Sequence, residues 1–168
     1  MEKFYLVKPS LERKNDALDY IQEILDNNKN DTDGTNKLKY YLNNYEEWIV
    51  KIEKDEKIIP TEESVPSKTY FFIRENDNKI VGMAIIDILN DIFKNIKYGY
   101  VNDVCIDPDY QGQGLSKKLM NKILEYGISN NLEYIMLTSN KKRIAAHGLY
   151  KSMGYEIVDT CVFKKYMK

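Results

Sequence analysis

The chain has 168 residues, with 25 lysines and arginines against 26 aspartates and glutamates, and a net charge of −1. A chain of this length suits one domain, residues 1–168, and buries enough surface to fold without a disulfide or metal staple. Because the charges nearly balance, the composition argues against a surface for polyanions, and nucleic acid is not an expected partner.

Cys105, Cys161 and the single histidine do not have the spacing of a zinc site, so no metal is expected. The two cysteines are expected to be buried thiols in a reducing compartment. The first residues lack an apolar core of signal-peptide length, and no apolar run reaches the roughly 18 residues of a membrane span. The sequence therefore predicts a cytoplasmic protein, a monomer or homodimer, without a membrane partner.

The hydrophobic pattern of the first half changes between helical and strand periods. The expected elements are a strand at 4–7, helices at 10–25 and 38–49, and a strand hairpin at 69–74 and 79–89. Residues 26–34 and 53–68 are expected to be loops. The first loop is acidic, but taking Gly34 as the sixth position of a calcium loop puts Lys29 where the first carboxylate belongs, so a calcium site is rejected.

The second half contains a strand, a tight loop and a helix in succession. Val101–Ile106 is rich in β-formers, Asp107-Pro108 ends the strand, and Gly112 and Gly114 allow unusual backbone conformations. An amphipathic helix begins at Leu115. Further on, the pattern predicts a strand at 134–138, a helix at 142–153 and one or two strands at 155–166. This alternation indicates an α/β fold around a mixed sheet.

The junction of this loop and helix is a candidate anion site. The first N–H groups of a helix have no intrahelical partner and lie at the positive end of the helix dipole. Two nucleotide motifs can be excluded, because neither glycine is followed by the lysine of a phosphate-binding P-loop, and Lys117 stands where a dinucleotide fingerprint needs its third glycine.

The segment Gln111 to Ser116 reads Gln-x-x-Gly-x-Ser, which resembles the Arg/Gln-x-x-Gly-x-Gly/Ala signature of the GNAT family of acetyl-CoA-dependent N-acetyltransferases. Together with Asn102-Asp103, the segment around it is similar to the glucosamine-6-phosphate N-acetyltransferase branch. Residues 143–155 resemble the second signature of the family, and residues 65–90 are similar to uncharacterised bacterial predicted acetyltransferases. The resemblance implies a three-layer α/β/α fold with a mixed, centrally splayed sheet.

The resemblance also implies how acetyl-CoA, the expected cofactor, is bound. The loop amides would hold its pyrophosphate, and the preceding strand would pair with its pantetheine arm and face the thioester oxygen. These are mainly main-chain roles. The residues implied are Val104, Cys105, Ile106, Gln111, Gly112, Gln113, Gly114, Leu115 and Ser116.

Two side chains are candidates for catalysis. Asp103 is a candidate base or amine-orienting group, because a protonated amine must lose a proton before it attacks; alternatively it hydrogen-bonds a turn or strand edge. Tyr150 matches the family's tyrosine that faces the departing sulfur; alternatively it is a core aromatic. The expected reaction is direct attack of a small-molecule primary amine on acetyl-CoA. A protein or peptide acceptor, or a non-catalytic acetyl-CoA-binding domain, remains open.

Overall fold

The structure is a computed structural model that describes residues 2–27, 35–59, 65–161, 163 and 165. These residues fall into two compact units, the sheet unit, Met1–Thr138, and the C-terminal unit, Ser139–Lys168. The predicted loop at 26–34 lies mostly outside the described residues, as does part of the one at 53–68.

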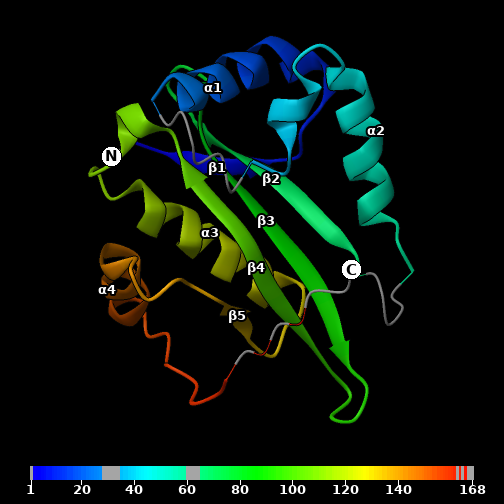
Figure 1. Cartoon of the computed structure of the whole chain (residues 1–168), viewed down its shortest axis with the longest axis vertical. Helices are drawn as coiled ribbons and strands as arrows, with labels where there is room; N and C mark the ends of the chain where they lie inside the picture. The colour runs from blue at the N-terminus through cyan, green and yellow to red at the C-terminus, as the bar shows by residue number, and fades with distance from the viewer. Residues whose placement is uncertain (1, 28–34, 60–64, 162, 164, 166–168) are drawn as a thin grey trace. The chain divides into compact units, whose positions relative to one another are not determined.

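The sheet unit is built on one mixed five-stranded sheet (Figure 1). The strands lie in the order of the chain, and the first three pairings are antiparallel while β4 and β5 are parallel. The mixed sheet expected from the sequence is confirmed. Its strands are β1 (Phe4–Val7), β2 (Ser67–Arg74), β3 (Ile80–Asp91), β4 (Ile96–Ile106) and β5 (Ile135–Leu137).

Helices cover both faces of this sheet, giving three layers (Figure 1). Phe71 and Met83 share a core with α1 (Lys14–Asn27) and α2 (Tyr45–Glu56) on one face. On the other face, where α3 (Leu115–Ser129) lies, the Phe4 ring stacks on Phe72 at 5.1 Å. Neighbouring residues of a strand point to opposite faces, so each strand supplies both cores. The largest fully buried side chains include Tyr20, Tyr45, Trp48, Phe71 and Phe72.

The single helix predicted at 38–49 is divided in the structure. A 3₁₀ turn, η2 (Leu38–Tyr41), precedes α2, and the carbonyl of Asn44 accepts a hydrogen bond from the amide of Glu47 at 3.0 Å at the start of α2. Asparagine favours such cap positions over helix interiors, which explains the break. At its other end α2 runs on to Glu56, into the predicted loop, because Ile52 extends its buried stripe.

Two irregularities bend the central strands. Phe72 pairs with Gly82 and Ile73 with Ile80, so β3 has one extra residue, Val81, beside Gly82. In β4, Asn102 is the extra residue, because Asp103 pairs with Ile85 whereas Val101 pairs with Ile86. Bulges of this kind increase the local twist and redirect side chains, and they are frequent beside active sites.

The C-terminal unit contains one helix, α4 (Ile144–Ser152), followed by Gly154 with a φ of +84°. The helix predicted at 142–153 is confirmed, and a left-handed glycine is a common way for a helix to end. The strands predicted at 155–166 are not formed by residues 155–161, and 162, 164 and 166–168 lie outside the described residues. Cys161 is exposed, which corrects the expectation that both thiols are buried.

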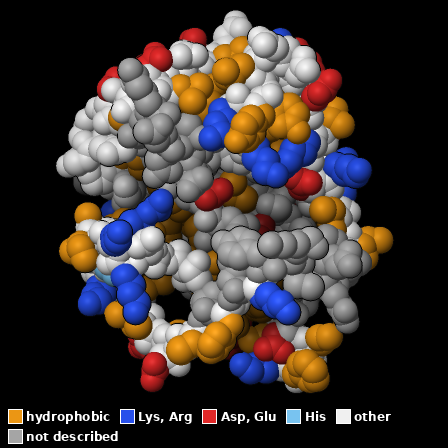
Figure 2. All heavy atoms as spheres, viewed as in Figure 1, with side chains coloured by type: hydrophobic (Ala, Val, Ile, Leu, Met, Phe, Trp, Pro, Cys, Tyr) orange, Lys and Arg blue, Asp and Glu red, His pale blue; other side chains and the backbone are white. Residues whose placement is uncertain are grey.

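Both basic and acidic side chains lie on the face seen in Figure 2. None of the helices formed by the described residues is long and apolar enough to cross a lipid bilayer.

Gly82 is required by close packing between β3 and β4. A Cβ atom there would lie 2.8 Å from the carbonyl oxygen of Cys105 and 2.8 Å from Cδ1 of Ile106. We expect Gly82→Ala to lower the free energy of unfolding by about 1–3 kcal/mol. Gly148, inside α4, has nothing within 4 Å of such an atom, so Gly148→Ala should raise it by about 0.5–1 kcal/mol. Urea denaturation measures both, and equal effects would contradict this explanation.

Candidate active site

The loop between β4 and α3 owes its shape to two glycines. Gly112 and Gly114 have φ angles of +76° and +74°, in the left-handed region that side chains disfavour. A Cβ at either position would meet nothing within 4 Å, so conformation rather than crowding requires glycine there. Gly114 is the N-cap of α3, and the loop therefore turns directly into the helix.

This turn leaves a run of main-chain donors without acceptors. The amide of Lys118 donates to the carbonyl of Gly114 at 3.3 Å, which opens the α3 hydrogen-bond ladder. Within the described part of the chain, the amides from Gly112 to Lys117 donate no hydrogen bond. They lie at the positive end of the helix dipole, where a phosphate group is stabilised by both the donors and the field.

Gln111 contributes to the loop in a different way from the glycines. Its amide donates to the carbonyl of Pro108 at 3.2 Å, and its side-chain Nε2 donates to the carbonyl of Ile106 at 3.2 Å. The Gln111 amide is thus already used inside the protein, and the side chain fastens the loop to the end of β4. Gln113 makes a similar bond, from Nε2 to the carbonyl of Asp109 at 3.3 Å.

The second half of β4 has a strand on one side only. β5 pairs with β4 from Gly99 to Val101, whereas β3 pairs with β4 as far as Ile106. Of the strands that the described residues form, none continues beside residues 102–106 on the β5 side. This opening is the splay in the sheet that the family resemblance implies. Here the edge of β4 continues beyond the end of β5 and leads to the loop between β4 and α3 (Figure 1).

The Asn102 bulge sets the faces to which the neighbouring side chains point. Cys105 packs against the core on the α1 and α2 face. Asp103 is two residues away in the same strand, so it points to that face too, and Val104 points to the α3 face. The side chain of Asn102 donates to Asp87 on β3, and burial raises the pKa of the Asp87 carboxyl above its usual value.

Tyr150 belongs to the C-terminal unit, where it is half-buried on α4. Its ring lies edge-on to that of Tyr155, with centroids 5.9 Å apart, and its carbonyl accepts a hydrogen bond from the amide of Tyr155 at 3.0 Å. Burial raises the pKa of the Tyr150 phenol. The phenol therefore keeps its proton at neutral pH and can act as a hydrogen-bond donor.

The structure brings most of the predicted site residues together in the sheet unit. Val104–Ile106 form the edge of β4 beyond the end of β5, Gln111–Ser116 form the loop that follows, and Asp103 lies next to the bulge. Sequence reasoning treated Asp107 only as part of a turn. In the structure its carboxylate is fully buried and accepts a hydrogen bond from the amide of Asp109 at 3.0 Å. The Asp107-Pro108 pair indicated the turn in the sequence, but nothing in the sequence indicated that the Asp107 side chain is buried.

The model of the Acetyltransferase (GNAT) family matches residues 23–155 of this chain. The chain therefore belongs to the GNAT acetyltransferase family. This match begins in the sheet unit and ends in the C-terminal unit, so it includes both Asp103 and Tyr150.

Individual relatives are distant. An uncharacterised N-acetyltransferase of Archaeoglobus fulgidus is 24% identical over 140 residues, which are 83% of this chain and 86% of that protein. N-acetylaspartate synthetase of Xenopus tropicalis is 40% identical, but over 53 residues, which are 32% of this chain and only 20% of that protein. The crystal structure of glucosamine-6-phosphate N-acetyltransferase from Arabidopsis thaliana has a TM-score of 0.64 at 15% identity, covering 99% of this chain and 100% of that one. This likeness confirms the GNAT fold.

Proposed function

We propose that this protein transfers the acetyl group of acetyl-CoA to a primary amine of a small molecule, and that both units form one N-acetyltransferase domain. The observation that carries the proposal is the run of amides from Gly112 to Lys117, which has no acceptor among the described residues and lies at the N-terminus of α3. A diphosphate bridge, as in coenzyme A, matches such a row of donors.

The edge of β4 beyond the end of β5 suits the rest of the acetyl donor. A pantetheine arm contains amide groups, which can hydrogen-bond to a strand edge as another strand would. Coenzyme A bound by its diphosphate at the loop would place this arm along residues 104–106. A main-chain N–H of that segment could then stabilise the oxyanion that forms when the thioester carbonyl is attacked.

Asp103 is the group that we assign to the acceptor. Free amines of the lysine type have a pKa of about 10.4, so nearly all are protonated at neutral pH and cannot attack. A carboxylate beside the thioester attracts the ammonium ion and accepts its proton, directly or through water. The position of Asp103 next to the bulge, two residues from Cys105, supports this role.

Tyr150 is assigned to the departing sulfur. A thiolate leaves when the tetrahedral intermediate collapses, and a hydrogen bond from a phenol stabilises its charge. Because burial raises the pKa of Tyr150, complete transfer of its proton to a thiolate is uphill, and hydrogen-bond donation is the more favourable contribution. The names of two similar proteins, glucosamine-6-phosphate N-acetyltransferase and N-acetylaspartate synthetase, support a small-molecule acceptor, because both name small molecules.

Two measurements on one ¹⁵N-labelled sample test this proposal. Titration with coenzyme A should shift the amide resonances of Gly112, Gln113 and Gly114 before those of the rest of the chain. Incubation with acetyl-CoA and a panel of primary amines should release free thiol with at least one amine. Binding at another place would refute the assignment of the loop, and binding at the loop without turnover on any amine would favour a non-catalytic acetyl-CoA-binding domain.

Tyr150→Phe should lower kcat by about tenfold or more, because the thiolate loses its hydrogen-bond donor, while Kd for acetyl-CoA stays close to that of the wild type. Tyr155→Phe is a matched control. The Tyr155 hydroxyl is buried and has no hydrogen-bond partner among the described residues, so its loss should leave kcat unchanged. Equal rates in wild type and Tyr150→Phe would remove Tyr150 from the mechanism.

Asp103→Asn should lower kcat/KM for the amine by about 100-fold at pH 7, because the amide cannot accept the proton. The rate of the variant should rise by about tenfold per pH unit as the amine itself loses its proton. Asp91→Asn, at the end of β3, changes the charge equally and should leave the pH profile as it is. If Asp103→Asn kept the wild-type profile, a role in orientation or structure alone would be indicated.

A further inference from the structure

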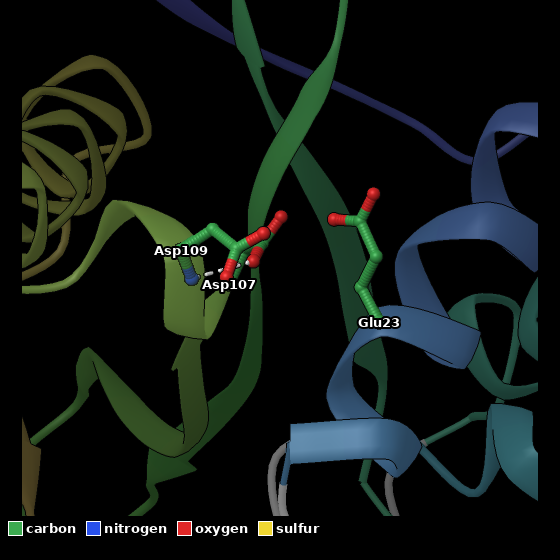
Figure 3. A group of neighbouring side chains, drawn as sticks. All are labelled: Glu23, Asp107 and Asp109. Carbon is green, nitrogen blue, oxygen red and sulfur yellow. Dashed lines mark hydrogen bonds between the residues drawn. The ribbon is translucent and has the colours of Figure 1, made fainter.

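Three carboxylates from different elements lie close together beside the start of the loop between β4 and α3 (Figure 3). Glu23 lies on α1, Asp107 follows the end of β4, and Asp109 lies in the 3₁₀ turn η3 (Pro108–Tyr110). One oxygen of each lies within 4.8 Å of the others. Asp109 is exposed, Glu23 is half-buried, and Asp107 is completely buried.

One carboxylate oxygen of Asp107 is buried without a hydrogen-bond donor among the described residues. Its Oδ1 accepts the amide of Asp109, but its buried Oδ2 accepts no hydrogen bond within the described residues. The ammonium of Lys79 lies 4.0 Å from Oδ2. The neighbour that faces it is the Glu23 carboxylate, which also accepts hydrogen bonds and donates none while it is ionised. A buried acceptor without a donor is costly.

The ammonium of Lys79 lies beside Glu23 and Asp107, where a metal ion would otherwise bind. Its Nζ donates to both oxygens of Glu23, at 2.9 and 3.1 Å, and lies 5.1 Å from the centre of the Tyr110 ring. One ammonium balances only one of the two inner carboxylates. A divalent metal ion would have to displace Lys79, whereas a single proton between Glu23 and Asp107 would balance the charge and supply the missing donor.

The remaining titratable and charged groups around Asp107 do not supply that donor. On α1 the hydroxyl of Tyr20 donates to the carbonyl of Cys105 at 3.4 Å. On the β2 side Arg74 forms an ion pair with Asp77 and donates to the hydroxyl of Tyr110 at 3.1 Å. Glu23 is therefore the group with which Asp107 can share a proton.

We propose that Glu23 and Asp107 form a carboxyl pair that shares one proton, and that binding of coenzyme A at the adjacent loop is coupled to uptake of this proton from solvent. The proton forms an O–H bond on Oδ2 of Asp107 and is donated to the Glu23 carboxylate. The coupling rests on the proposed function, which places the diphosphate on residues 112–117. A diphosphate brings negative charge close to Asp107, and the ionised pair would repel it.

The titration of the pair falls in an accessible range. Burial, with the Glu23 contact next in importance, raises the pKa of Asp107 to about 7. Burial works in the same direction on Glu23, but the hydrogen bonds from Asp107 and Lys79 outweigh it and lower the pKa of Glu23. The proton therefore resides on Asp107. Below pH 7 the pair is already protonated, and above it binding must take up a proton or bear the repulsion, so affinity should fall as the pH rises through about 7.

Dephospho-coenzyme A is the probe that tests this coupling, because it keeps the diphosphate but lacks the 3′-phosphate monoester, a group that itself titrates near pH 6. Its Kd is measured by calorimetry from pH 6 to pH 8.5 on the whole protein. For the wild type we expect Kd to rise by about three- to tenfold over this range. Asp107→Asn, in which an amide replaces the acid, should show less than about a twofold change.

Asp109→Asn is the matched control, since it removes a charge from the same turn but at an exposed position, and it should keep the wild-type dependence on pH. Equal pH dependence in wild type and Asp107→Asn would overturn the coupling, whereas absence of binding to the wild type at every pH would instead refute the proposed function and the coupling with it.

The pair itself is tested without ligand. A carboxyl whose pKa is raised by folding stabilises the protein at low pH, and this contribution is lost as the pH rises to the folded pKa. Between pH 4 and pH 7 the stability of the wild type should therefore fall relative to that of Asp107→Asn, and the ¹³C resonance of the Asp107 carboxyl should titrate near pH 7. Titration below pH 5, or Mn²⁺ binding that Asp107→Asn abolishes, would overturn the shared proton.

Discussion

The candidate site depends on the main-chain amides at the start of α3, which have no hydrogen-bond acceptor within the helix. A helix that begins at Leu115 leaves its first amides without partners, and the left-handed glycines at 112 and 114 add to that row. In many helices a side chain at the N-cap accepts a hydrogen bond from one of these amides. The N-cap of α3 is Gly114, and no side-chain cap is present there. The fold thus leaves a row of amide donors to which the oxygens of a diphosphate could hydrogen-bond.

The splayed sheet gives this set of donors a direction. Since β5 stops beside Val101 while β4 continues to Ile106, the edge of β4 leads from the bulge to the loop. The bulge at Asn102 adds one residue at the start of this edge, next to Asp103. A row of main-chain donors, a strand edge and the carboxylate of Asp103 therefore lie within a short length of this chain.

A buried carboxylate, that of Asp107, lies at the start of the loop between β4 and α3. Asp107 is fully buried, yet it caps the turn η3, so the same carboxylate shapes the loop between β4 and α3 and carries a charge that is costly to bury. The ammonium of Lys79 balances only one of the two negative charges of Asp107 and Glu23. A buried acid that is structurally needed and incompletely paired is a natural place for a proton to be gained when another anion arrives nearby.

The sequence by itself determined the strand, loop and helix around Gly112 and Gly114, because glycine spacing and hydrophobic period act locally. It also indicated the family. The prediction from the sequence missed the helix break at Asn44, although asparagine is a local signal for it. It also missed the meeting of Glu23 with Asp107, because that depends on how distant segments pack. Tertiary structure alone decided which face Asp103 occupies, where β5 ends and that Asp107 is buried, because register and burial arise only when the strands and helices assemble.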